Sequence, residues 1–458
     1  MSRRSSRFAR VVSRASCLAV LLPVARAWAA PDDGFALSDD GALMGGAVIA
    51  SGRDAASAWY NPALLGTNRR NHIDVSATVY GLRRTRAPAG VVEHVGAETR
   101  SVEAFDRQFV VVPSAFAIAT ALRRNVTLGF GVFTSHWYEP EVRASGRGFN
   151  AAGQHSYLHE VRMLGLSRRH HAGPMIGWSP VRNLQLGLAI HGIYDKQERM
   201  TRVFANVSSL EGVESTTLAA NSDSELRSFG GRAIFGIRGT LGKWVQAGAV
   251  LRTPAISVHQ TVSGSESLVV ATIDRTGETD NRAELQIDPV PRRPGPLAPW
   301  TVGTGLSVGN ARWRINFDAE SVAALRDATG ELRQRAYWNV RLGGRYQISR
   351  KWTIGAGLFT DRSGVPDVNV SEIDIDLWGG SLGVQFLSPV RLAPGQRAGS
   401  LAFRTTVAAR YAGGVGRFGQ IQLHFPESGA ADFSAVFDET TDATLHFVSV
   451  YVGTGLVF

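Results

Sequence analysis

The 458-residue sequence lacks most features that mark an enzyme or a disulfide-stabilised protein. Its single cysteine, Cys17, lies in the first 29 residues, so the remainder can form no disulfide and has no thiolate chemistry. No G-x-S-x-G, P-loop, H-E-x-x-H or paired C-x-x-C motif occurs. Beyond the N-terminal segment no apolar run reaches ~18 residues and no helical periodicity of convincing length appears, so membrane-spanning helices are not expected.

Two groups of residues have the residue types of a metal site or an acid/base pair, but they do not form a known motif. His155, His159 and Glu160 could share a strand face as metal ligands, and Asp374 and Asp376 could mimic an acid/base pair. Solvated histidines, in the lumen or in turns, and lumen-facing carboxylates are the more common explanation, because a barrel interior is polar. The sequence therefore predicts no catalytic residue, no metal ligand and no cofactor, and the protein is expected not to be an enzyme.

The N-terminal segment predicts export. The first thirty residues hold six arginines and no acid, an apolar run from Ala15 to Ala25 follows, and Ala27-Trp28-Ala29 forms a small-x-small cleavage site. Residues 1–29 are therefore expected to be a cleaved signal peptide. Without them 43 basic and 39 acidic residues remain, a net charge of about +4, so the high overall charge does not indicate a nucleic-acid partner.

The rest of the chain reads as strands that alternate between an apolar and a mixed face. Leu184, Leu186, Leu188 and Ile190 share one face of their strand. In the strand from Arg312 to Ala319, arginines lie opposite the apolar side chains. A barrel that turns its apolar face to lipid and its polar face to a wet lumen has this pattern.

Strand spacing predicts an all-β fold, a transmembrane antiparallel barrel of about 14 strands over residues 71–458. The expected strands are 72–82, 108–120, 125–138, 155–178, 183–196, 224–240, 243–262, 298–309, 311–324, 335–347, 351–360, 373–387, 400–426 and 444–458. Long connections alternate with short ones, as extracellular loops alternate with periplasmic turns in outer-membrane barrels. The localisation expected is the outer membrane of a Gram-negative bacterium, with the N-terminus in the periplasm.

Residues 30–70 do not alternate and predict a small helical plug, or hatch. The stretch is rich in glycine and small residues, and it ends in Trp59, Tyr60, Asn61, Pro62 and Ala63. Pro62 favours the first position of a helical turn, and Asn61 can cap it. A glycine-rich start, this run and the following strands resemble the FadL-type outer-membrane transporters of hydrophobic compounds. In that family the segment plugs the barrel lumen.

The resemblance extends to NVTLGFGV at 125–132, AVLRTPAIS at 249–257 and RYQISRKWTIGAGLFTDRSGVPD at 345–367. It implies passive uptake of hydrophobic small molecules, such as long-chain fatty acids or similar apolar compounds. It also implies a lateral exit at a kinked third strand, where Gly129 and Gly131 could permit a kink. Which residues bind the substrate is left open.

The C-terminal strand alternates and ends in Phe458, which resembles the signal read by the barrel-assembly machinery during biogenesis. Outer-membrane lipid and lipopolysaccharide are the other expected partners, and a monomer is expected.

Three rival functions remain open from the sequence. A general diffusion porin would need an open lumen. A barrel enzyme, such as an outer-membrane lipase or protease, would need a nucleophile and base at the rim. A structural or adhesive surface protein would bind no ligand.

Overall fold

The computed structural model describes most of the chain beyond residue 34. The described residues are 35–67, 70–95, 98–149, 155–209, 215–274, 277–292, 295–327, 330–366, 373–390, 401–425, 434–436 and 439–458. The expected signal peptide, residues 1–29, and the first residues of the expected hatch lie outside them.

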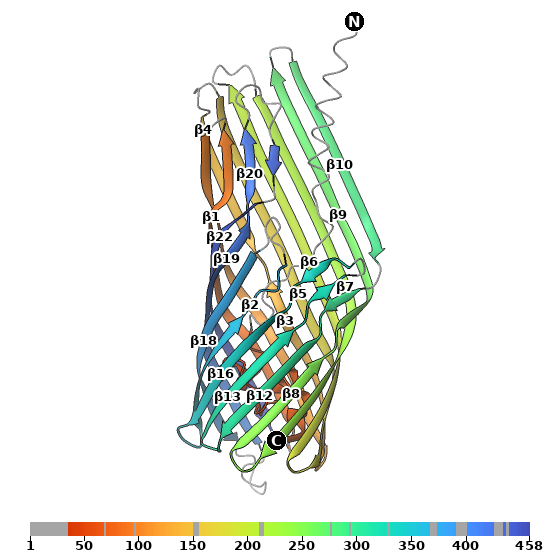
Figure 1. The fold of residues 1–458 in the computed structure, drawn as a ribbon, viewed down its shortest axis with the longest axis vertical. Helices are drawn as coiled ribbons and strands as arrows, with labels where there is room; N and C mark the ends of the chain where they lie inside the picture. Colours follow the sequence, from red (N-terminus) through yellow and green to blue (C-terminus); the bar gives the residue numbers. More distant parts are fainter. Residues whose placement is uncertain are drawn as a thin grey trace.

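Fourteen antiparallel strands close into a barrel (Figure 1), which confirms the predicted fold class and strand number. Each strand pairs with its neighbour along the ring, and β22 closes the ring by pairing with both β19 and β1. The wall strands are β1 (His72–Val95), β2 (Glu98–Arg123), β3 (Val126–Tyr138), β5 (His155–Val181), β6 (Leu184–Ser209), β7 (Ser215–Leu241), β8 (Val245–Arg252), β12 (Thr301–Gly309), β13 (Trp313–Val322), β16 (Tyr337–Gln347), β17 (Trp352–Asp361), β18 (Ile373–Val390), β19 (Leu401–Gly419) and β22 (Thr440–Val457).

The wall strands differ in length because some continue far above the rest. Strands β12, β13, β16 and β17 have 9, 10, 11 and 10 residues, which matches the ~9–11 residues that a tilted strand needs to span a bilayer. Strands β5 and β7 have 27 residues each. The additional strands are β4 (Glu141–Phe149), β9 (Ala255–Asp274), β10 (Gly277–Arg292), β11 (Pro296–Ala298), β14 (Leu325–Arg326), β15 (Leu332–Gln334), β20 (Ile421–Phe425) and β21 (Ser434–Val436).

The predicted long connections are therefore largely strand. Of residues 83–107, expected as a loop, 83–95 and 98–107 are the upper halves of β1 and β2. The two strands pair as far as Val95 and Glu98, with one register shift between Ala87 and Val91. The expected strand 243–262 is two strands, because the chain leaves the ladder at Thr253 and Pro254. A proline has no N–H to donate to a neighbouring strand.

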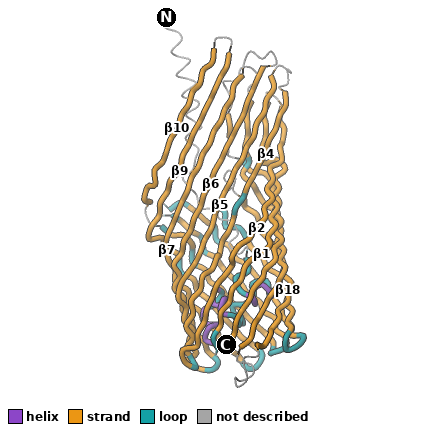
Figure 2. Tube along the Cα trace, turned by 180° about the vertical axis from the view of Figure 1, so that it is seen from behind, coloured by secondary structure: helices purple, strands orange, loops and turns teal. Residues whose placement is uncertain are grey.

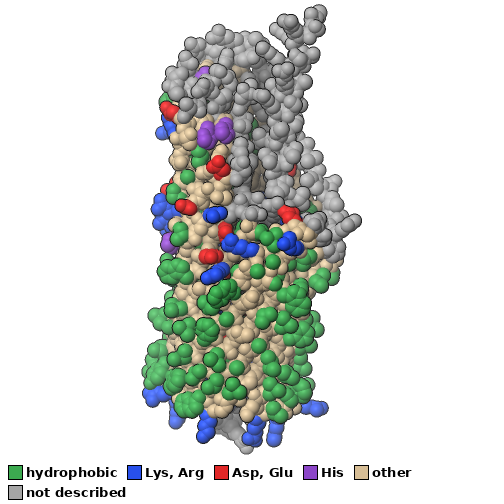
Figure 3. Space-filling view, viewed as in Figure 1, with side chains coloured by type: hydrophobic (Ala, Val, Ile, Leu, Met, Phe, Trp, Pro, Cys, Tyr) green, Lys and Arg blue, Asp and Glu red, His purple; other side chains and the backbone are tan. Residues whose placement is uncertain are grey.

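The outer surface has an apolar band around the lower half of the barrel (Figure 3). Large side chains that would be buried in a soluble protein are exposed there, among them Leu358, Leu382, Ile315 and Phe317. Exposed tryptophans mark the strand ends, as expected of interfacial girdles: Trp178, Trp244, Trp300, Trp338 and Trp352. This surface fits lipid.

Three short helices lie inside the lower part of the barrel (Figure 2). They are α2 (Asp39–Leu43), η1 (Ala55–Trp59) and η2 (Pro62–Thr67). All the residues from Phe35 to Leu65 are buried except Arg53. The described part of the hatch therefore fills the lumen at the level of the apolar band. Among the described residues, no helix is long and apolar enough to cross a membrane.

Candidate functional site: the lumen above the hatch

The hatch sits directly against wall positions that have no side chain. A Cβ added at Gly187 would collide with Pro62 and Ala63, and one at Gly236 would collide with Asn61. Further inward-facing glycines contact the hatch in the same way: Gly177, Gly248, Gly305, Gly343, Gly355 and Gly357. Close approach of two backbones needs glycine on one of them. The glycines of the wall strands thus form the seat of the hatch.

Buried ion pairs fix one side of the hatch to the wall. Arg404 of β19 donates from Nε to Asp39 Oδ2 at 2.7 Å and from Nη2 to Asp74 Oδ1 at 2.5 Å. Arg345 of β16 donates to Asp40 Oδ1 at 2.8 Å. Breaking one partner of such a pair leaves a buried charge uncompensated, so these contacts hold the hatch strongly.

The expected hatch motif lies on the opposite side, against β3 to β8. Asn61 Oδ1 accepts from the N–H of Ala63 at 3.0 Å, and η2 begins at Pro62. Asn61 Nδ2 donates to the wall carbonyl of Ile237 at 3.1 Å and to Ile49 within the hatch at 2.9 Å. One amide therefore caps a helical turn and binds it to the wall.

Trp59 and Tyr60 face the space above the hatch. The Trp59 ring lies 5.1 Å from that of Phe133 and 4.7 Å from that of His171, measured between centroids. Tyr60 accepts a hydrogen bond from the N–H of Leu37 at 3.4 Å. Trp59 and Tyr60 both line the cavity above the hatch, so the hatch presents an aromatic surface to it.

A cavity of about 70 Å³ lies on this surface; we call it the arginine chamber. Four arginines and one glutamate line it: Arg169, Arg232, Arg252, Arg341 and Glu320. Arg252 and Arg341 both contact the single Glu320, at 3.1 and 3.4 Å. Arg169 also pairs with the buried Asp195, at 3.1 Å. The arginines still outnumber the carboxylates beside them, which favours an anionic group.

A second cavity, of about 50 Å³, is also lined by Phe35; we call it the apolar pocket. Phe35 lines both cavities. The remaining lining is mostly apolar or aromatic: Val110, Trp137, Tyr138, Leu377, Leu445 and Phe447, together with Arg83, His136 and Asp361. The edge of the Phe35 ring meets Phe447 with centroids 6.1 Å apart. This pocket fits a hydrocarbon group.

The wall beside the apolar pocket has an interrupted ladder. Pairing between β2 and β3 ends at Ala115 and Phe133, and on that side β2 next pairs with β4, at Phe105 and Arg143. Within the described residues, 106–114 of β2 therefore have ladder partners only in β1. Val110 of β2 and His136, Trp137 and Tyr138 of β3 line the pocket next to this gap.

The third strand is irregular, but not at the two glycines singled out from the sequence. Gly129 and Gly131 pair in regular register with β2 and with β5. The register of β3 against β5 shifts between Thr134 and His136, so that Ser135 is an extra residue. A β-bulge of this kind bends a strand locally. A kink at Gly129 and Gly131 stays a prediction, and the observed irregularity begins after them.

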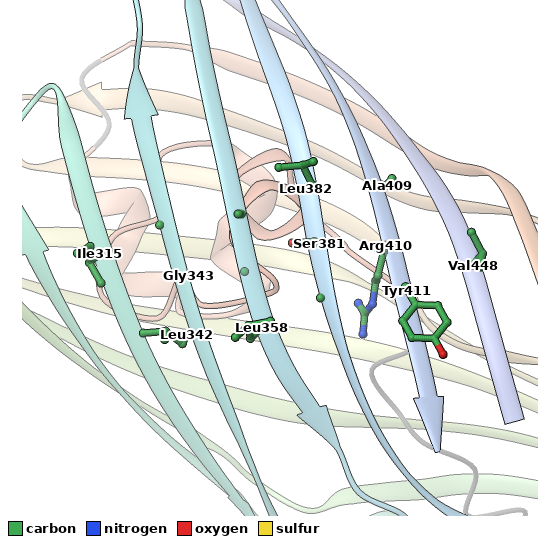
Figure 4. Close-up of a pocket in the computed structure, with 14 residues that line it drawn as sticks. Ile315, Leu342, Gly343, Leu358, Ser381, Leu382, Ala409, Arg410, Tyr411 and Val448 are labelled. Carbon is green, nitrogen blue, oxygen red and sulfur yellow. The ribbon is translucent and has the colours of Figure 1, made fainter. Parts of the chain in front are cut away.

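A third depression lies on the lipid side of the wall and is not part of the lumen (Figure 4). Small residues such as Gly344, Ala356 and Gly380 form its floor between the exposed side chains of Leu342, Leu358 and Leu382. It is a shallow apolar groove in a surface that lipid covers.

The other residues weighed from the sequence do not assemble into a site. Asp374 and Asp376 lie on β18, where Asp374 pairs with Arg335 and Asp376 accepts from the N–H of Ser363. His159 is fully buried beside Glu93, 3.3 Å away. Among the described residues, no group of three or more His, Cys, Asp or Glu could hold a metal ion.

The closed barrel, the lipid-facing band and the plugged lumen define the class of protein: an outer-membrane β-barrel of the Gram-negative type, closed by an N-terminal hatch. Its particular fold is that of the FadL-type transporters, which confirms the fold that the resemblance implied.

Comparisons with solved structures carry this assignment. A Pseudomonas aeruginosa FadL homologue is similar over 95% of this chain and 98% of its own, with 10% identity and a TM-score of 0.50. The Pseudomonas putida toluene transporter TodX is similar over 93% and 99%, with 13% identity and a TM-score of 0.51. No protein-family model matches the chain. No curated protein matches it either.

Sequence reasoning predicted a hatch motif at Trp59 to Ala63 but predicted neither cavity. The arginines of the chamber come from four different strands, β5, β7, β8 and β16, and Phe35 lies outside the motif. The sequence held one indication of a positively charged lumen, because arginines recur on the non-apolar faces of the strands. It could not show which of them converge.

Proposed function

We propose that the protein is a passive outer-membrane transporter for amphipathic acids, molecules with a hydrocarbon tail and one anionic group, such as long-chain fatty acids. The observation that carries this proposal is that the arginine chamber and the apolar pocket share Phe35 as a lining residue. Charge-assisted hydrogen bonds from arginine suit a carboxylate, and the apolar pocket suits the tail.

Substrate leaves the apolar pocket sideways in this proposal, through the gap between β2 and β3. The hatch is fixed by buried ion pairs and by the glycine seat, whereas the gap lies directly beside the pocket. A lateral route delivers an apolar molecule into lipid rather than water. The position of the described hatch inside the lumen favours a transporter over a general diffusion porin, because a porin needs an open lumen.

The partners follow from this assignment. We propose that the protein acts as a monomer in a bilayer with lipopolysaccharide outside, and that the barrel-assembly machinery inserts it. The solved structures to which it is similar include a FadL homologue and a toluene transporter, which favours transport over an enzymatic activity. Single-channel conductance tests the porin alternative, and a screen on lipid and peptide substrates tests the lipase or protease alternative.

Uptake measured in a Gram-negative host that lacks its own transporter of this kind tests the substrate class. The chain should support uptake of both a labelled long-chain fatty acid and labelled toluene. The double variant Arg169→Gln/Arg232→Gln should reduce fatty-acid uptake roughly tenfold, on the scale of one lost charge-assisted hydrogen bond, and leave toluene uptake intact. Phe447→Ser, in the apolar pocket, should reduce both.

The control variant is Arg227→Gln, which removes an exposed arginine paired with Glu225 and should change neither rate. Equal loss of fatty-acid and toluene uptake in the arginine variant would contradict a role of the chamber in binding the anionic group. Absence of fatty-acid uptake by the unmodified chain would contradict the proposed substrate class, and absence of uptake of both compounds would contradict the transporter assignment.

A further inference from the structure

The short turns at the lower end of the barrel carry positive charge and no negative charge. Each of the five described turns, β2–β3, β5–β6, β7–β8, β12–β13 and β16–β17, holds an arginine or lysine, and none holds an acid. Figure 3 shows these blue side chains along the lower edge of the molecule. With the residues that flank the turns they form the basic rim: Arg70, Arg123, Arg124, Arg182, Lys243, Arg312, Arg350 and Lys351.

The upper half of the barrel is built differently. There acids lie among the exposed arginines, and some of these arginines form ion pairs, as Arg86 does with Glu103 and Arg227 with Glu225. Others, such as Arg84 and Arg107, are exposed without such a pair to any described residue. In the part of the chain that the structure describes, no residue of the basic rim forms an ion pair. The abundance of arginine in the sequence explains why both the upper and the lower end of the barrel carry cations. It does not explain why the turns at the lower end hold no acid.

Aromatic side chains place the basic rim at a defined depth. Trp178, Trp244, Trp313 and Trp352 are exposed directly above it. Trp244 of the β7–β8 turn and Trp313, the first residue of β13, lie close together, with ring centroids 6.2 Å apart. Exposed tryptophans occupy the boundary between hydrocarbon and headgroups, so the cations below them lie at headgroup level.

We propose that the basic rim binds anionic phospholipid headgroups in the periplasmic leaflet of the outer membrane. Lysine and arginine next to a membrane are attracted to anionic lipid. The charges of the basic rim are spread around the circumference of the barrel, next to successive wall strands from β1 to β17. A ring of lipid contacts all of these positions at once, whereas an acidic protein would cover one sector only.

Lipid retention by the full-length protein tests this proposal. The detergent-purified chain is exchanged into nanodiscs of equal parts phosphatidylglycerol and phosphatidylethanolamine, and retained lipids are counted by native mass spectrometry. We expect phosphatidylglycerol to be enriched roughly fivefold, the ratio that one favourable cation–headgroup contact provides. Half-molar salt should abolish the enrichment, because mobile ions screen exposed charges.

Two variants each neutralise half of the turn charges. Arg124→Gln/Arg182→Gln/Lys243→Gln and Arg312→Gln/Arg350→Gln/Lys351→Gln should each lower the enrichment by about half on a logarithmic scale, in proportion to the charges removed. The matched control is Arg86→Gln/Arg143→Gln/Arg227→Gln, which removes three exposed arginines from the upper half and should leave the enrichment unchanged.

The proposal would be overturned if the unmodified protein retained phosphatidylglycerol and phosphatidylethanolamine in equal amounts. This outcome would apply even if an acidic protein bound the same surface. The proposal would also be overturned if the control variant lost as much phosphatidylglycerol enrichment as the rim variants. The enrichment would then depend on the total charge of the protein and not on the basic rim. If one rim variant fails to fold, the other variant and the salt dependence of the unmodified protein still decide between these outcomes.

Discussion

Arg404 and Asp39 are 365 positions apart in the chain, and in the structure they form a buried ion pair of 2.7 Å between the last but one wall strand and the first helix of the hatch. The same guanidinium binds Asp74, the third residue of β1. One side chain therefore joins β19, the hatch and β1, where the barrel closes. Opening the lumen by moving the hatch requires this arginine to lose its partners.

Arg404→Gln should therefore loosen the hatch. The change leaves Asp39 and Asp74 buried without their cation, and breaking a buried pair typically costs about 3–5 kcal/mol. We expect a lower unfolding temperature and more frequent conductance events in planar bilayers. Arg227→Gln is the control, since its exposed pair with Glu225 contributes little. Conductance equal to that of the unmodified protein would mean that other contacts hold the hatch.

Deletion of residues 31–70, with the signal segment and barrel kept, should open an aqueous channel. A lumen ~14 strands wide that loses its plug fills with water. We expect higher ion conductance and antibiotic leakage, together with loss of saturable uptake of hydrophobic compounds. A deletion variant that reaches the outer membrane and conducts no more than the complete chain would refute the plug.

Gly236→Val should displace the Asn61–Pro62 turn from its seat. The added side chain meets Asn61 and Pro62, and overpacking of this kind costs about 1–3 kcal/mol. Gly239→Val, on the same strand, is the matched control, because a Cβ there has no close neighbour. Thermal unfolding of the two variants is compared, and equal unfolding temperatures would contradict the glycine seat.

Deletion of Ser135 should restore an even register of β3 against β5 and narrow the gap beside the apolar pocket. Removing the extra residue of a bulge removes the bend that it produces. Uptake of a long-chain fatty acid should fall, while Ser135→Gly, which keeps the bulge, should retain it. The lateral route is wrong if the deletion variant folds and transports at the full rate.

Phe458→Asp should reduce the yield of protein in the outer membrane. Phe458 is exposed on the lipid side and exchanges two backbone hydrogen bonds with Asn71, at 2.9 and 3.0 Å, where the two ends of the barrel meet. A charge on a lipid-facing position is unfavourable, and the aromatic end resembles an assembly signal. Phe458→Tyr keeps the ring and serves as control; equal yields of all three proteins would remove the argument.

The sequence by itself determined the class of fold and the number of strands. Alternating faces, as in Leu184 to Ile190, follow from the two-residue period of a strand, which is a local property. It also determined the site of the hatch, because the Asn61–Pro62 turn is encoded by neighbouring residues. The extent of the strands above the membrane was underestimated, since polar residues on both faces of β6 and β7 give no apolar alternation, yet these strands pair as far as Ser208 and Ser215.

Only the tertiary structure decided which side chains meet in the lumen. Arg169, Arg232, Arg252 and Arg341 face one chamber because the tilt and register of β5, β7, β8 and β16 bring them together. The gap after Phe133 likewise depends on the register of β3 with two neighbours. A period-2 pattern shows which face a residue occupies, but its height in the barrel depends on pairing between segments far apart in the chain.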